Sequence, residues 1–132
     1  MSVTVINEML GRTFKEVFKN ENDELVFRGD YSRGVWGTVF TFFHFQEGCE
    51  KVWIEDIVGD LDDLKDEPLT EAEVVTEECD VGEGHQTWSF FKFGTSKGCV
   101  VVRWCGESEG FYSECVSLKR ELTDVFDFDS DF

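Results

Sequence analysis

The chain has 132 residues, of which 41% are hydrophobic and 15% aromatic, and its formal net charge is −17. This length predicts one domain that buries enough surface to fold without disulfides or metals. Fourteen Phe and four Trp make the chain too apolar for a disordered acidic protein. The charge argues against direct binding to nucleic acid or to an anionic membrane, and it favours basic partners.

The acidity is concentrated in one central segment. Residues 47–83 hold fifteen Asp and Glu against Lys51 and Lys65, which gives a net charge of −13. Residues 1–46 sum to −1, residues 84–120 to +2 and residues 121–132 to −5. The central segment therefore dominates the electrostatics of a nearly neutral frame.

The first third of the chain predicts a short helix followed by strands. Residues 5–10 are predicted to be helical, with Gly11 as the stop. Residues 13–28 are typical of a β-hairpin whose turn lies at 20–23. Residues 36–45 form a strongly β-prone aromatic run, which predicts a central strand covered on both faces.

The acidic segment is predicted to fold rather than to remain an open run. Residues 51–57 alternate in a way that indicates a strand with one wet face. Asp60 is predicted to cap one helical turn around Leu61 and Leu64. Residues 70–78 combine helix-favouring acids with β-branched residues; we favour an edge strand whose charges discourage pairing with other chains.

The last third predicts a three-stranded antiparallel meander. Its strands are expected at residues 87–93, 98–105 and 111–118, joined by short turns. The tail, residues 123–132, alternates acids with Phe and is either disordered or a strand-like arm. The expected fold is α+β and mainly β: a single twisted antiparallel sheet with a short N-terminal helix and one helical turn. Residues 1–122 are expected to form the domain and 123–132 the tail.

Two blocks of residues carry a resemblance to a known family. The first is His44-x-Gln46 followed by Cys49-Glu50-x-Val52-x-Ile54-Glu55-Asp56-Ile57-x-Gly59-Asp60-Leu61-x-Asp63-Leu64. The second is Thr87-Trp88-x-Phe90 followed by Lys97-Gly98-x-Val100-x-x-Arg103-Trp104-x-Gly106-x-Ser108-x-Gly110-Phe111-Tyr112-Ser113-Glu114. Over roughly residues 9–118 the chain resembles a small acidic phage-encoded family of unknown function. The resemblance implies a phage origin and assigns no reaction.

The sequence favours neither a metal site nor an enzyme. His44, Cys49, Cys79 and His85 lack the close spacing of a structural zinc site. The Asp60-x-Asp62-Asp63 run lacks the central glycine of an EF-hand. Five cysteines without a close pair fit a reducing cytosol better than a disulfide framework. We therefore expect no metal, no cofactor and no enzymatic activity.

The leading hypothesis is acidic mimicry of nucleic acid. Separated carboxylates on a folded frame imitate phosphates and attract the Arg and Lys residues of a nucleic-acid-binding groove. The expected role is a phage-encoded inhibitor in the cytoplasm of an infected bacterium, directed at the basic groove of a CRISPR effector or a restriction enzyme. The partner-binding candidates are Glu55, Asp56, Asp60, Asp62, Asp63, Asp66, Glu67, Glu71, Glu73, Glu77 and Glu78.

The alternative is a non-enzymatic module that binds another protein through an aromatic surface, while its acidity serves solubility. Its expected hot spots are Trp36, Trp53, Trp88 or the phenylalanines of the tail.

Overall fold

The computed structural model describes residues 6–32, 35–122 and 125–131. These residues form strands and two short 3-10 helices. In chain order the elements are η1 (Asn7–Met9), β1 (Glu16–Lys19), β2 (Leu25–Arg28), β3 (Tyr31–Ser32), β4 (Val35–Trp36), β5 (Thr38–Phe43), β6 (Lys51–Val58), η2 (Leu61–Leu64), β7 (Glu71–Val81), β8 (Gly84–Thr95), β9 (Gly98–Ser108), β10 (Ser117–Leu122) and β11 (Val125–Asp131).

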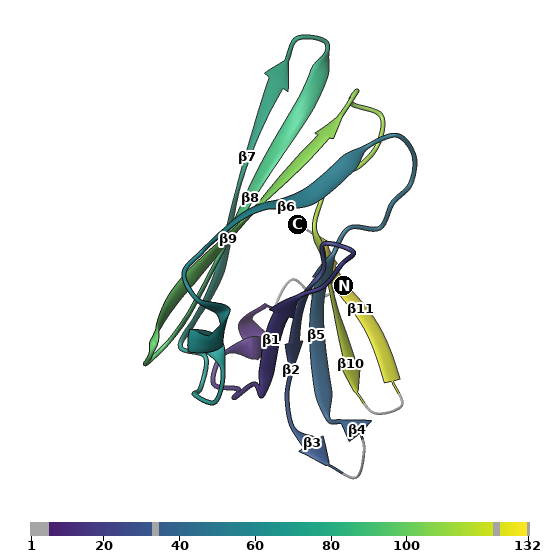
Figure 1. Cartoon of the computed structure of the whole chain (residues 1–132). Helices are drawn as coiled ribbons and strands as arrows, with labels where there is room; N and C mark the ends of the chain where they lie inside the picture. The colour runs from purple at the N-terminus through teal and green to yellow at the C-terminus, as the bar shows by residue number, and fades with distance from the viewer. Residues whose placement is uncertain (1–5, 33–34, 123–124, 132) are drawn as a thin grey trace.

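The strands form two main antiparallel sheets, as Figure 1 shows. One has five strands in the order β1-β2-β5-β10-β11, and the other has four in the order β6-β9-β8-β7. A two-stranded ribbon, β3-β4, lies at one end. The predicted α+β fold with a single sheet is therefore wrong: the described chain is nearly all β and has two sheets. The chain leaves the five-stranded sheet after β5 and returns to it after β9. The prediction failed because the alternation of residues within a strand does not show which sheet the strand joins.

The core lies between the two sheets. The ring centroids of Phe42 and Phe91 are 4.9 Å apart, and those of Phe27 and Phe93 are also 4.9 Å apart. Each pair joins one strand of the five-stranded sheet to β8 of the four-stranded sheet. All four side chains are fully buried. Alternation along the strands places these rings inward, and their large areas stabilise the packing of the sheets.

The predicted helices are 3-10 turns. The helix expected at 5–10 is reduced to η1, and residue 5 lies outside the described part of the chain. The turn predicted at Asp60 is present as η2, and the Asp60 side chain accepts a hydrogen bond of 2.9 Å from the Asp62 N–H. Neither helix of the described residues has the length and apolarity needed to cross a membrane.

The hairpin at 13–28, the strand at 51–57 and the strand at 70–78 are confirmed as β1–β2, β6 and β7. Within β6 the register shifts between Ile54 and Asp56, which marks a β-bulge at Glu55. The bulge turns Asp56 toward the face that carries Trp53, contrary to the simple alternation expected from the sequence.

The predicted meander is wrong in its membership. In the structure the meander consists of β7, β8 and β9. The predicted third strand, 111–118, overlaps β10 only at its end, and β10 belongs to the five-stranded sheet. Residues 111–116 are not a strand, because they form the crossing between the sheets. The tail prediction left two alternatives open, and residues 125–131 form β11, which pairs with β10. Residues 123, 124 and 132 lie outside the described chain.

Candidate functional site: the acidic four-stranded sheet

The structure divides the predicted acids into three groups. Glu55 and Asp56 lie on β6, and Glu71, Glu73, Glu77 and Glu78 lie on β7. The remaining five, Asp60, Asp62, Asp63, Asp66 and Glu67, lie in or beside η2. Because β6 and β7 are opposite edges of the four-stranded sheet, the acids do not form one contiguous row.

The acids around η2 make local structural contacts. Asp60 caps the turn, and Asp62 pairs with Lys65 at 2.9 Å. Asp66 pairs with Lys15 at 3.7 Å and has a positive φ of 66°. These carboxylates already have partners within the chain, so they are less available to a partner protein than unpaired acids, although each exposed ion pair contributes little to stability.

The acids of β7 are held at regular spacing on an edge strand. Side chains two residues apart on one face of a strand are about 6.7 Å apart. Glu71, Glu73 and Glu77 share the face away from the core, and Lys92 pairs with Glu71 at 3.5 Å. Glu73 and Glu77 are exposed and make no ion pair with any described residue. These two carboxylates are therefore the most available members of the predicted set.

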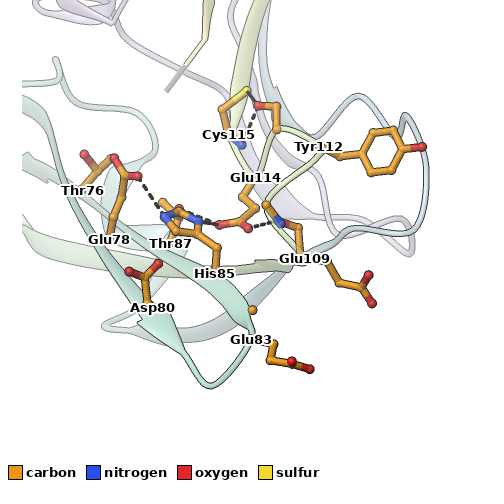
Figure 2. Close-up of a pocket in the computed structure, with 14 residues that line it drawn as sticks. Thr76, Glu78, Asp80, Glu83, His85, Thr87, Glu109, Tyr112, Glu114 and Cys115 are labelled. Atoms are coloured by element: carbon orange, nitrogen blue, oxygen red, sulfur yellow. Dashed lines mark hydrogen bonds and ion pairs between the residues drawn. The ribbon is translucent and has the colours of Figure 1, made fainter.

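Glu78 faces the opposite side of β7 and lines a cavity of about 480 Å³. The cavity lies between the end of the β7–β8 hairpin, the end of β9 and the segment that crosses to β10 (Figure 2). Asp80, Glu83 and Glu109 also line it, and His85 is the one basic side chain among the described residues of its lining. The cavity therefore favours cationic groups over anionic ones.

The His85 ring is held between two carboxylates, as Figure 2 shows. Its Nδ1 lies 2.8 Å from Glu114 Oε1, and its Nε2 lies 3.1 Å from Glu78 Oε1. The hydrogen bond to Glu114 raises the pKa of His85, and the charges of Glu78 and Asp80 act in the same direction against burial. Both ring nitrogens are engaged, so the ring has no free nitrogen for a substrate or a metal.

Glu114 anchors the segment that crosses between the sheets. It is 6% exposed, and it accepts hydrogen bonds from Thr87 Oγ1 at 2.7 Å and from Ser108 Oγ. Gly106 allows this approach, since a Cβ there would lie 2.8 Å from the Glu114 Cβ. The site prediction omitted Glu114, although the motif that carries the family resemblance contained it.

The other crossing is fixed by His44 and Glu50. The His44 ring places Nδ1 2.7 Å from the Cys115 carbonyl oxygen and Nε2 2.7 Å from Glu50 Oε2. Burial by itself raises the pKa of Glu50, but hydrogen bonds from the Glu47 N–H, the His44 ring and the Gly48 N–H outweigh it and lower the pKa to about 2. The cluster ties the end of β5, the start of β6 and the approach to β10 together.

The metal-binding and nucleophilic capacity of the described residues can be stated from these contacts. Within residues 6–32, 35–122 and 125–131, no group of three or more His, Cys, Asp and Glu side chains could hold a metal ion. All five cysteines are free, and burial raises the pKa of the Cys105 thiol to about 11, which disfavours the nucleophilic thiolate. The His85 and His44 clusters position backbone segments.

Comparison with known proteins identifies the family of this chain but assigns no biochemical activity to it. No curated protein and no solved structure matches the chain significantly. The family model that does match is described only as a domain of unknown function, which leaves source and activity open. It covers residues 7–118, most of the chain, so this protein belongs to the domain of unknown function family DUF7448.

Proposed function

We propose that this chain is a non-enzymatic inhibitor that binds the basic groove of a nucleic-acid-binding protein. Its carboxylates take the place of phosphates and attract the Arg and Lys side chains of that groove. The proposed target is a bacterial CRISPR effector or restriction enzyme. The inhibitor itself is proposed to be encoded by a phage and to act in the cytoplasm of the infected cell. Direct binding to nucleic acid or to a membrane is disfavoured by the charge of −17.

The observation that supports the proposal is the acidic edge strand β7. Its sequence, EAEVVTEECDV, holds five carboxylates on a strand whose edge is open. From Glu71 to Asp80 the strand spans on the order of 30 Å, so its five charges lie about 7.5 Å apart on average. One strand of DNA carries a charge about every 3.4 Å, so β7 supplies about half of that density, and Glu83 and Glu109 at the cavity add to it.

A DNA-cleavage assay with purified CRISPR effector nucleases and restriction endonucleases tests this function. The chain is expected to inhibit a target in competition with DNA. Inhibition should weaken steeply between about 50 and 200 mM salt, because exposed charge pairs are screened. The double variant Glu73→Lys/Glu77→Lys should need at least ten times more protein for the same inhibition.

The matched control is Glu21→Lys/Asp30→Lys, which changes the net charge equally. Both residues are exposed and belong to the β1–β2 side of the molecule. This control should inhibit like the unmodified chain. The proposal is wrong if no enzyme of either class is inhibited, or if the two double variants behave identically.

A further inference from the structure

The face of the four-stranded sheet that points away from the core carries an aromatic centre, and we call it the outer face. Register places Glu77, Trp88, Cys105 and Trp53 in one row across β7, β8, β9 and β6. In the next row on the same face, Phe90 stands beside Arg103. Trp53, Trp88 and Phe90 are only partly buried, so their rings contact solvent in this chain.

The two indoles flank a small buried residue. Cys105 is 1% exposed although it points away from the core. Trp88 and Trp53 lie on either side of it, and Gln86 donates a hydrogen bond to its sulfur. Neighbouring strands are about 4.8 Å apart, so the indoles stand roughly 10 Å from each other across β9. The outer face thus presents two spaced aromatic platforms.

This face already binds one guanidinium group. The Arg103 guanidinium lies 5.4 Å from the centre of the Trp88 ring and 3.8 Å from an Asp56 carboxylate oxygen. Trp53 has the carboxylate without the cation: its indole N–H donates to Glu55 at 2.6 Å, and no cation of the described residues lies over its ring. The Trp53 ring therefore has a carboxylate beside it and no cation of the described chain over it.

The charge around the rings selects a basic occupant. The outer face carries six carboxylates against Lys51, Lys92 and Arg103; the acids are Glu55, Asp56, Glu71, Glu73, Glu77 and Glu107. Nucleic acid and a second copy of this chain are both repelled by that excess. Arg suits the face better than Lys, because its planar group stacks on rings and forms paired hydrogen bonds with carboxylates.

We infer that the outer face docks an arginine-rich segment of a partner protein. One guanidinium group stacks on the Trp53 ring and pairs with Glu55, and a second pairs with Glu77 beside Trp88, whose ring already carries Arg103. This inference rests on the proposed function, since it names the surface and the partner chemistry through which the acidic sheet binds. It adds that binding requires the aromatic rings as well as the charge.

Titration of fluorescent nona-arginine and nona-lysine peptides into the full chain tests the inference. Nona-arginine should bind more tightly, with quenching of tryptophan fluorescence. Trp53→Leu/Trp88→Leu should weaken nona-arginine binding about 5- to 30-fold and leave nona-lysine binding nearly unchanged. Phe45→Leu/Phe111→Leu, at rings that are 65% and 83% exposed elsewhere, is the aromatic control and should bind normally.

A second variant keeps the inference testable if the tryptophan variant does not fold. Glu55→Gln/Glu77→Gln changes exposed side chains, and it should weaken nona-arginine binding several-fold while the unfolding midpoint stays unchanged. Equal binding of the two peptides, or wild-type affinity for nona-arginine in either the tryptophan or the glutamine variant, overturns the inference.

The outcomes also separate the two proposals. If the tryptophan variant loses nona-arginine binding but inhibits a nuclease like the wild type, the docking surface is wrong and the proposed function stands. If binding depends on the tryptophans and no nuclease is inhibited, the docking surface stands and the proposed function fails.

Discussion

Coupling between Phe42 and Phe91 tests the packing of the two sheets. Phe42 lies on β5 and Phe91 on β8, and their ring centroids are 4.9 Å apart at an interplanar angle of 64°. We consider Phe42→Leu, Phe91→Leu and the double variant. Leucine keeps an apolar side chain, so the fold is retained while the edge-to-face contact is removed.

The magnitudes follow from burial and ring geometry. Both side chains are fully buried, so each single change should destabilise the chain by about 0.5–3 kcal/mol. An aromatic pair in this geometry contributes about 0.5–1.5 kcal/mol beyond its buried area. The double variant should therefore lose less stability than the sum of the singles, by about that coupling energy. Alanine is unsuitable here, because about 3–5 kcal/mol per site approaches the whole stability of a domain.

Urea unfolding followed by tryptophan fluorescence measures the four free energies of unfolding. Phe45→Leu, at a side chain that is 65% exposed, should stay within about 0.5 kcal/mol of the wild type and serves as the control. Strict additivity of Phe42→Leu and Phe91→Leu would falsify the packing described here, because side chains without contact do not couple.

Three further predictions concern the crossings between the sheets. The pKa of Glu50 is lowered to about 2, so the ionised carboxylate stabilises the folded state above about pH 4.5, and this stabilisation is lost as the pH falls toward 2. The difference in free energy of unfolding between wild type and Glu50→Gln, measured by urea titration, should therefore narrow from pH 4.5 to pH 2. The pKa of His85 is raised, so the protonated ring stabilises the folded state below about pH 6.5, and this stabilisation is lost at higher pH. The difference in free energy of unfolding between wild type and His85→Gln should therefore be larger at pH 6 than at pH 9. The opposite trend contradicts the ion pair with Glu114. Gly106→Ala should cost about 1–3 kcal/mol by overlap with Glu114, whereas Gly37→Ala, whose new Cβ meets its nearest atom at 3.5 Å, should change little; equal melting temperatures for the two variants would show that Glu114 does not pack on Gly106.

Local patterns in the sequence predicted several strands and the capped turn, although the strand predicted at 111–118 was wrong. Alternation located β6, the β-branched residues within 70–78 located β7, the composition of residues 20–23 located the β1–β2 turn, and Asp60 was correctly assigned as the cap of η2. These features depend on neighbours within a few residues, so they are legible in one sequence. Charge counting likewise found the acidic segment without any knowledge of its shape.

Sheet membership and the grouping of side chains were decided only by tertiary structure. The assignment of β10 to the five-stranded sheet depends on long-range pairing with β5 and on the His44–Cys115 and Thr87–Glu114 contacts, which join residues far apart in the sequence. Strand pairing within the four-stranded sheet separates the acids of β6 from those of β7 and brings Trp53 and Trp88 to either side of Cys105. Alternation specifies that a residue faces one side of its strand. Only the register between strands specifies which residues share that side, because the register is set by the packing of the whole core.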